Sequence, residues 1–143
     1  DTDTYSGNLK LNGFYEGMQE CGLDPAGRAV RCDSDAVSAG SCFGKLLDGG
    51  EKIDAVITAN DVLAAGVLNA ALRRGMRVPE DLSVVGYNNS VITQCTTPQL
   101  SSIDNGLEKL CELAVDGLSK LLRGEKIEGS SMIPPHLVAR ETM

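Results

Sequence analysis

Aromatic residues are scarce in this chain of 143 residues, which has no Trp, two Phe and three Tyr. The hydrophobic share is nevertheless 42%, so the core must be built mainly from Leu, Val, Ile and Ala. A share of this size excludes wholesale disorder, and the length fits one domain or one lobe of a larger protein.

Excess positive charge is also absent: 13 Lys and Arg stand against 20 Asp and Glu, and the formal net charge is −7. Binding to a phosphate backbone requires clustered basic side chains, so this segment is not expected to bind nucleic acid by itself. A small-molecule ligand or a protein partner is compatible with the acidic balance.

Paired cysteines and long apolar runs are missing as well. The five Cys residues are an odd number without a C-x-x-C pair, which is typical of free thiols in a reducing cytoplasm and unlike a disulfide framework or a zinc site. No stretch approaches the ~20 apolar residues of a membrane span, and no signal peptide is visible. The first residues, DTDTYSGN, lack an initiator Met and lead us to expect a chain that begins inside a larger protein. We therefore expect a cytoplasmic segment without metal, cofactor or membrane partner.

Catalytic motifs are lacking too. The glycine-containing stretches do not have the G-x-x-x-x-G-K-[ST] spacing of a phosphate loop. A Cys–His nucleophile pair would have to use His136, which stands far along the chain from Cys32 and Cys42. The adjacent carboxylates of Glu80 and Asp81 point apart in an extended turn, so we expect them to be solvated rather than to form an acid–base pair. No enzymatic activity is expected.

What the sequence does contain is an alternation of helix and strand patterns. Helices are predicted over residues 6–22, 37–50, 61–74 and 105–123, and strands over residues 28–34, 53–59, 82–87 and 100–104, with an irregular loop over 88–99 and two short extended pieces in the tail 131–143. Strands that alternate with helices predict an α/β fold with a mostly parallel sheet and helices on both faces.

The junction DAVITANDVLAAG, residues 54–66, places an amide and a carboxylate where a strand ends and a helix begins. In an open α/β sheet, ligands bind at the carboxyl ends of the strands. Asn60 stands at such an end, and Asn88 follows the next strand in VVGYNN. Two amides there can donate and accept together, which suits hydroxyl-rich or heterocyclic ligands. Asp61 is predicted to cap the helix, whereas Asn60 either contacts a ligand or serves as a cap itself.

These residues resemble a known family. The stretch DAVITANDVLAAGVLNAALRRGMRVPEDLSVVGYNNS, with PQLSSID, the closing LVARET and the N-terminal SGNLKLNGFYEGM, resembles the effector-sensing domain of lactose/galactose-repressor-type (LacI/GalR) transcription regulators. The resemblance covers nearly the whole chain but only the second half of such a regulator. It implies a two-lobe, periplasmic-binding-protein-like fold of type I with an effector, usually a sugar or purine, in the cleft. Residues 1–104 and 131–143 would form the C-terminal lobe, and the helix 105–123 would cross toward the N-terminal lobe.

The resemblance also implies a set of effector contacts, which are carried over by position. The expected contacts are Lys10, Asn60, Asn88, Asn105, Ser6 and Asp35. Lys10 stands where the family usually has an effector-gripping Arg, and Asn88 stands where an Asp commonly accepts sugar hydroxyls. Lys lacks the bidentate fork of Arg, and Asn exchanges a charged acceptor for a donor, so the identity of the effector does not transfer.

Homodimerisation is expected from the helix 61–74, which is apolar nearly all round, because a surface helix shows one apolar stripe. In the family this helix and the loop 94–98 lie in the subunit interface. The expected interface residues are Ala65, Leu68, Cys95 and Thr96. The alternative is a helix whose outer Ala residues are simply tolerated. The apolar stripe of the helix 105–123 would lose its usual cover in a fragment, so this helix is expected to fold back, to pair with another copy or to be mobile.

The sequence thus predicts the effector-sensing and dimerisation part of a transcription regulator that contacts DNA only through a headpiece absent from this chain. Two alternatives stay open. An extracytoplasmic solute-binding protein of a transport system would share the fold, and its gene would encode a signal peptide in place of a helix-turn-helix. A small doubly wound enzyme would need a nucleophile or an acid–base pair at the strand ends, where only amides and Lys10 are predicted.

Overall fold

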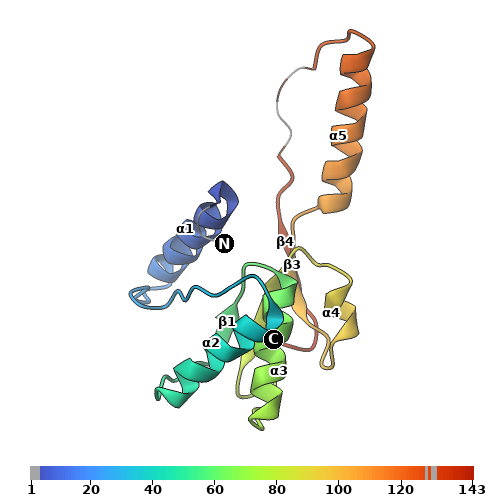
Figure 1. Ribbon diagram of the computed structural model, residues 1–143. Helices are drawn as coiled ribbons and strands as arrows, with labels where there is room; N and C mark the ends of the chain where they lie inside the picture. The colour runs from blue at the N-terminus through green and yellow to red at the C-terminus, as the bar shows by residue number, and fades with distance from the viewer. Residues whose placement is uncertain (1–3, 128, 130–131) are drawn as a thin grey trace.

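The computed structural model describes residues 4–127, 129 and 132–143 (Figure 1). Along the chain its elements are α1 (Tyr5–Glu20), α2 (Ala36–Asp48), β1 (Ala55–Ile57), α3 (Asp61–Arg73), β2 (Ser83–Tyr87), α4 (Ile92–Cys95), β3 (Ser101–Asp104), α5 (Leu107–Leu122) and β4 (His136–Val138). The predicted start of the returning tail, at residue 131, lies outside the described residues.

Three parallel strands and one antiparallel strand form the sheet, in the order β1-β2-β3-β4. β2 pairs in parallel with β1 and β3, and β4 pairs antiparallel with β3. The mostly parallel α/β sheet predicted from the sequence is therefore confirmed. Parallel neighbours put their carboxyl ends at one edge of the sheet, so Asn60, Asn88 and Asn105, which follow β1, β2 and β3, leave the sheet at the same edge.

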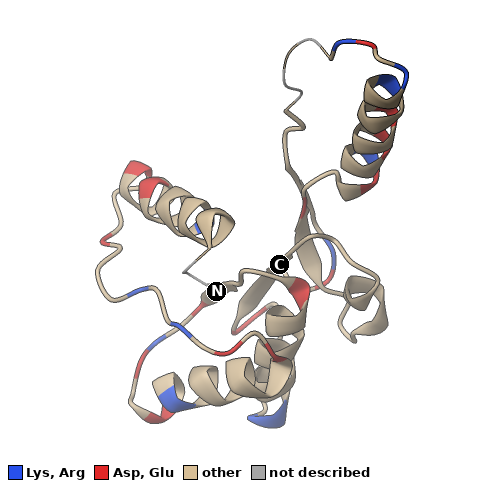
Figure 2. Ribbon diagram, turned by 45° about the horizontal axis from the view of Figure 1, so that its top comes forward, with Lys and Arg blue, Asp and Glu red and all other residues tan. Residues whose placement is uncertain are grey.

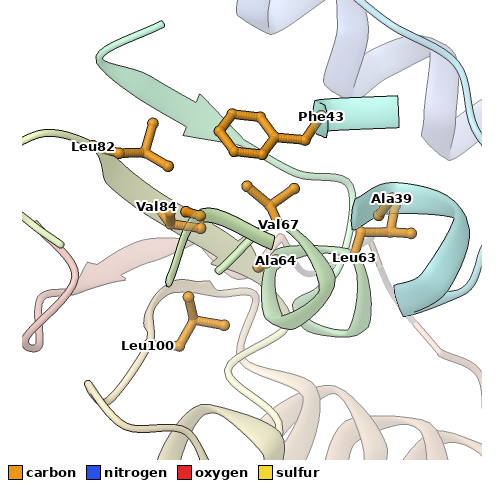
Figure 3. Close-up of a cluster of buried hydrophobic side chains, with 9 residues drawn as sticks. Ala39, Phe43, Leu63, Ala64, Val67, Leu82, Val84 and Leu100 are labelled. Atoms are coloured by element: carbon orange, nitrogen blue, oxygen red, sulfur yellow. The ribbon is translucent and has the colours of Figure 1, made fainter. Parts of the chain in front are cut away.

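The core lies between the sheet and the helices α2 and α3 (Figure 3). Its buried side chains are aliphatic apart from one aromatic ring: Ala39, Phe43, Leu63, Ala64, Val67, Ala71, Leu82, Val84 and Leu100. The aliphatic core expected from the composition is confirmed. α2 and α3 approach each other closely at Gly66, where an ideal Cβ would lie 2.1 Å from the carbonyl oxygen of Ala36. The absence of a side chain at Gly66 is what allows this contact.

The predicted strand over residues 28–34 does not form. This segment leads from α1 to α2 without joining the sheet, and it is exposed except at Cys32, which packs against the core. A strand is stabilised by pairing with a neighbour and by packing of one face, and in the described chain β1 is an edge strand that pairs only with β2. The strand propensity of residues 28–34 was therefore not sufficient to form a strand without a pairing partner. Within the predicted irregular loop, residues 92–95 form the one-turn helix α4.

The helices α1 and α5 stand away from this core (Figure 1). Neither helix has a buried side chain. α5 rises from the end of the sheet rather than folding back over it, and it carries exposed apolar side chains along its length. These are Leu107, Leu110, Leu113, Val115, Leu118, Leu121 and Leu122.

Basic and acidic residues alternate along the elements of the described part of the chain (Figure 2). Among the described residues, none of the helices has the length and apolar character that crossing a lipid bilayer requires.

Candidate functional site

Amide side chains follow the three parallel strands at their carboxyl ends, and two of them meet directly. Asn105 Nδ2 donates a hydrogen bond to Asn88 Oδ1 over 3.1 Å. Asn105 Oδ1 is buried and accepts no hydrogen bond from the described residues. Buried polar atoms are almost always paired, so Asn105 Oδ1 is an acceptor whose hydrogen bond the described residues leave unmade.

Lys10 reaches the same edge from α1. Its Nζ donates to the carbonyl oxygen of Ala59 at 3.0 Å and lies 3.9 Å from the centre of the Tyr87 ring. Ala59 precedes Asn60 and Tyr87 precedes Asn88, so Lys10 spans the ends of β1 and β2. Burial lowers the pKa of the Lys10 ammonium group, because desolvation disfavours the charged form. The sequence did not single out Tyr87, although its place at the end of β2 was the available signal.

Asn60, and not Asp61, caps α3. Asn60 Oδ1 accepts a hydrogen bond from the backbone N–H of Leu63 at 3.0 Å. The predicted capping role of Asp61 is therefore wrong, because the residue just before the helix, with its extended backbone, is the one whose side chain turns back to the free N–H groups. Asn60 Nδ2 donates to no acceptor among the described residues, so it is available to a ligand.

Asp61 is 2% exposed and joins three elements beneath this edge. Its Oδ1 accepts a hydrogen bond from Ser102 Oγ (2.6 Å), and its Oδ2 accepts one from the backbone N–H of Ser90 (2.7 Å). Gly86 of β2 leaves room for the carboxylate, since a Cβ there would lie 2.2 Å from Asp61 Oδ1. The carboxylate thus fixes the start of α3 to β3 and to the loop that follows β2.

A second network supports the loop after β2. Asn89 Oδ1 accepts a hydrogen bond from Arg140 Nη2 (2.6 Å), and Asn89 Nδ2 donates to Asp104 Oδ2 (2.8 Å). The hydrogen bond from Asn89 lowers the pKa of Asp104, and the backbone N–H of Gly106 adds to this effect. Asn88 and Asn89 have φ values of 99° and 48°, a region that Asn occupies more readily than most residues. Sequence reasoning missed this network, for which the Asn doublet was the only local signal.

Asp35 and Ser6, the other two effector contacts predicted from the resemblance, lie in different surroundings. Asp35 caps α2, where its Oδ1 accepts a hydrogen bond from the backbone N–H of Ser38 at 2.8 Å. Ser6 is exposed in the first turn of α1. No described hydrogen bond joins either side chain to the amides at the strand ends.

The four predicted interface residues differ in exposure. Cys95 is exposed at the end of α4, and Ala65 and Thr96 are half-buried. Leu68 is 1% exposed because it packs inside the chain itself, so it offers no surface to a second copy. Its place in the predicted interface is therefore corrected: α3 is apolar nearly all round partly because α2 and the sheet cover much of it. The exposed apolar side chains on α2 and α3 are Val37, Val62 and Leu72.

The whole chain, residues 1–143, matches the family described as periplasmic binding protein-like domain. The chain belongs to this periplasmic binding protein-like family. An HTH-type transcriptional regulator of Lachnoclostridium phytofermentans is 33% identical to it, in a match that covers 99% of this chain and 43% of the relative.

Solved structures of regulators share the fold of this periplasmic binding protein-like chain. The Lac repressor dimer bound to operator and the anti-inducer ONPF is 32% identical and has a TM-score of 0.84, over 96% of this chain and 48% of that chain. The complex of the transcriptional regulator CelR with cellobiose is 28% identical and has a TM-score of 0.88, over 100% of this chain and 44% of that chain. The chain therefore spans less than half of the length of each of these relatives. The resemblance to LacI-type regulators inferred from the motifs is confirmed, and these relatives are transcriptional regulators rather than transport proteins or enzymes.

Proposed function

We propose that this chain is the effector-sensing and dimerisation part of a cytoplasmic transcription regulator without enzymatic activity, which binds a sugar-like or purine-like molecule between two lobes. The observation that carries the proposal is the convergence of Lys10, Asn88 and Asn105 at one edge of the sheet. Lys10 donates to the carbonyl oxygen of Ala59, and the next residue, Asn60, has an amide nitrogen without a described acceptor. The operator complex of one relative and the cellobiose complex of another support DNA and a carbohydrate as partners of the full-length protein.

The chemistry of this edge suits binding rather than catalysis. Amides and a charged ammonium group hold a ligand through hydrogen bonds, and neither acts as a nucleophile while the amine stays protonated. Each Asn can donate and accept, so neighbouring hydroxyls or ring nitrogens of a ligand are matched in pairs. Effector binding would close a second lobe onto this edge, change the orientation of the lobes in the dimer and move the DNA-binding headpieces.

Replacement of Asn60 by Ser is expected to weaken the effector response without removing DNA binding. Ser keeps a side-chain oxygen to cap α3 but lacks the Nδ2 donor. In footprinting of the full-length protein on DNA upstream of its own gene, protection should remain. The concentration of a responsive carbohydrate or purine that changes the footprint should rise by about tenfold, which is the effect of losing one hydrogen bond to a ligand.

Asn69→Ser is the matched control, because Asn69 is exposed on the same helix. An effector response that Asn60→Ser leaves unchanged would remove Asn60 from the site. If the full-length protein protected no DNA, the regulator proposal would be wrong, and a solute-binding protein of a transport system would take its place.

Introduction of a carboxylate at Ala65 or at Cys95 is expected to weaken a homodimer of the full-length protein by at least about tenfold, because an unpaired charge would enter an apolar contact. Light scattering over a dilution series measures the dissociation. Lys52→Glu, in an exposed loop, is the control for the added negative charge. Equal dissociation of Ala65→Glu, Cys95→Glu and Lys52→Glu would show that α3 and α4 do not form the interface.

A further inference from the structure

The positive charge of Lys10 is held in place without being neutralised. One N–H of the ammonium group donates to the carbonyl oxygen of Ala59, and the face of the Tyr87 ring lies 3.9 Å away. A carbonyl dipole and an aromatic face attract a cation and fix its position, but neither carries a full negative charge. Every ion pair in the described part of the chain involves other residues. Lys10 therefore keeps N–H donors and its charge for a ligand.

The carboxylates closest in sequence to the amides are already engaged. Asp61 accepts from Ser102 and Ser90, and it lies on the face of the sheet where the missing side chain of Gly86 leaves room. Tyr87 follows Gly86 in β2, and successive side chains of a strand point to opposite faces. The ring under Lys10 and the carboxylate of Asp61 are therefore separated by the sheet.

The other nearby carboxylate, that of Asp104, is also committed. Its two oxygens accept hydrogen bonds from Asn89 Nδ2 and from the backbone N–H of Gly106. Asn88, at the end of β2, is an amide rather than an acid. Among the described side chains considered at this edge, the polar groups that remain open are thus neutral amides, the imidazole of His136 opposite Asp104, and the Lys10 cation, and no uncommitted carboxylate is among them.

A partly desolvated cation is costly unless an anion accompanies it. We propose that the effector carries an anionic group, a carboxylate or a phosphate, on a hydroxylated frame. The anionic group would contact Lys10 Nζ, and the hydroxyls would contact Asn60, Asn88 and Asn105. This inference rests on the proposed function, because it assigns a chemical class to the ligand of the same site. Tyr87 is a positioning residue in this arrangement, since it acts through Lys10.

The test is calorimetric titration of the full-length protein with pairs of probes that share a carbon skeleton. The carboxylate arm compares glucuronate with glucose and galacturonate with galactose, and the phosphate arm compares the 6-phosphates of both sugars with the free sugars. In the responsive arm, the anionic member should bind about tenfold more tightly than its neutral partner, because hydrogen bonds to charged groups are stronger than neutral ones. The arm in which this preference appears distinguishes a carboxylate from a phosphate.

Three variants assign the preference to the structure. Lys10→Met should abolish the preference for the anionic probe and leave the affinity of the neutral probe within about twofold. Lys45→Met, at an exposed position on α2, is the control and should change neither. Asn88→Asp keeps the acceptor for Asn105 Nδ2 but adds a negative charge, so it should weaken binding of the anionic probe more than that of the neutral one.

Two results would overturn the proposal. One is a neutral probe that binds as tightly as its anionic partner or more tightly, and the other is an anionic preference that survives Lys10→Met. Neither result contradicts the proposed function. The footprinting experiment compares the wild-type protein with Asn60→Ser, and its outcome does not depend on the charge of the effector. Conversely, a full-length protein that protected no DNA but still preferred the anionic probes would contradict the proposed function and leave the assignment of an anionic ligand standing.

Discussion

Gly66→Ala is expected to lower the free energy of unfolding by about 3 kcal/mol, which is at the upper end of the usual cost of overpacking. The added Cβ would lie 2.1 Å from the carbonyl oxygen of Ala36 and 2.8 Å from its Cα. Both are backbone atoms, so no rotation of a side chain relieves the clash. The helices α2 and α3 would have to separate, and the packing of Phe43 and Val67 in the core would loosen.

Urea denaturation of the full-length protein measures this loss. Gly17→Ala is the matched control, because Gly17 also lies inside a helix but, apart from its chain neighbours and the backbone of its own helix, no described heavy atom is within 4 Å of its ideal Cβ. That substitution should stabilise the protein by up to about 1 kcal/mol, the difference in helix propensity between Ala and Gly. If the two substitutions changed the unfolding midpoint alike, the close contact between α2 and α3 would be wrong.

Asp61→Ala is expected to cost about 3 kcal/mol of stability, because it leaves two hydrogen-bond donors unpaired beneath the sheet edge. The donors are the hydroxyl of Ser102, which is fully buried, and the backbone N–H of Ser90. The loop after β2 would also lose its tie to α3. A fall in effector affinity should therefore accompany the fall in stability, although Asp61 has no place among the ligand contacts.

A double-mutant cycle with Ser102→Ala separates the hydrogen bond from other effects of the substitution. Removing both partners should cost less than the sum of the two single losses, because the unpaired hydroxyl is gone in the double variant. Thermal unfolding of the four proteins measures the difference. If the two losses added to within about 0.5 kcal/mol, the bond between Asp61 and Ser102 would carry no coupling.

Much of the fold could be predicted from periodicity and turn chemistry. The helices α2 and α3 and the strand β2 lie close to their predicted positions, because apolar spacing and terminal glycines are local signals. The segment 28–34 shows the limit of such signals. Its composition favours a strand, but whether a strand forms depends on a neighbour, and no local pattern specifies that neighbour.

The candidate site was predictable in its position and less so in its connections. The place of Asn60 and Asn88 follows from the rule that parallel strands end at one edge. The sequence left open whether Asn60 caps α3 and assigned the cap to Asp61, because both side chains can cap and only the backbone of the turn decides between them. The hydrogen bond from Arg140 to Asn89 joins residues that are far apart in the chain, so no local sequence pattern could predict it.

The pairing of β3 with β4 places Asp104 opposite His136. Opposed residues in an antiparallel pair have Cα atoms about 5 Å apart, a gap that a tight two-residue turn can bridge. In topological terms, everything from residue 105 to residue 135, α5 included, is an insertion into a hairpin, and its excision would leave the order of the sheet unchanged. The insertion begins at Asn105, whose side chain donates a hydrogen bond to Asn88. The segment that contains α5 is therefore joined to the sheet at the edge where Asn88 and Asn105 lie.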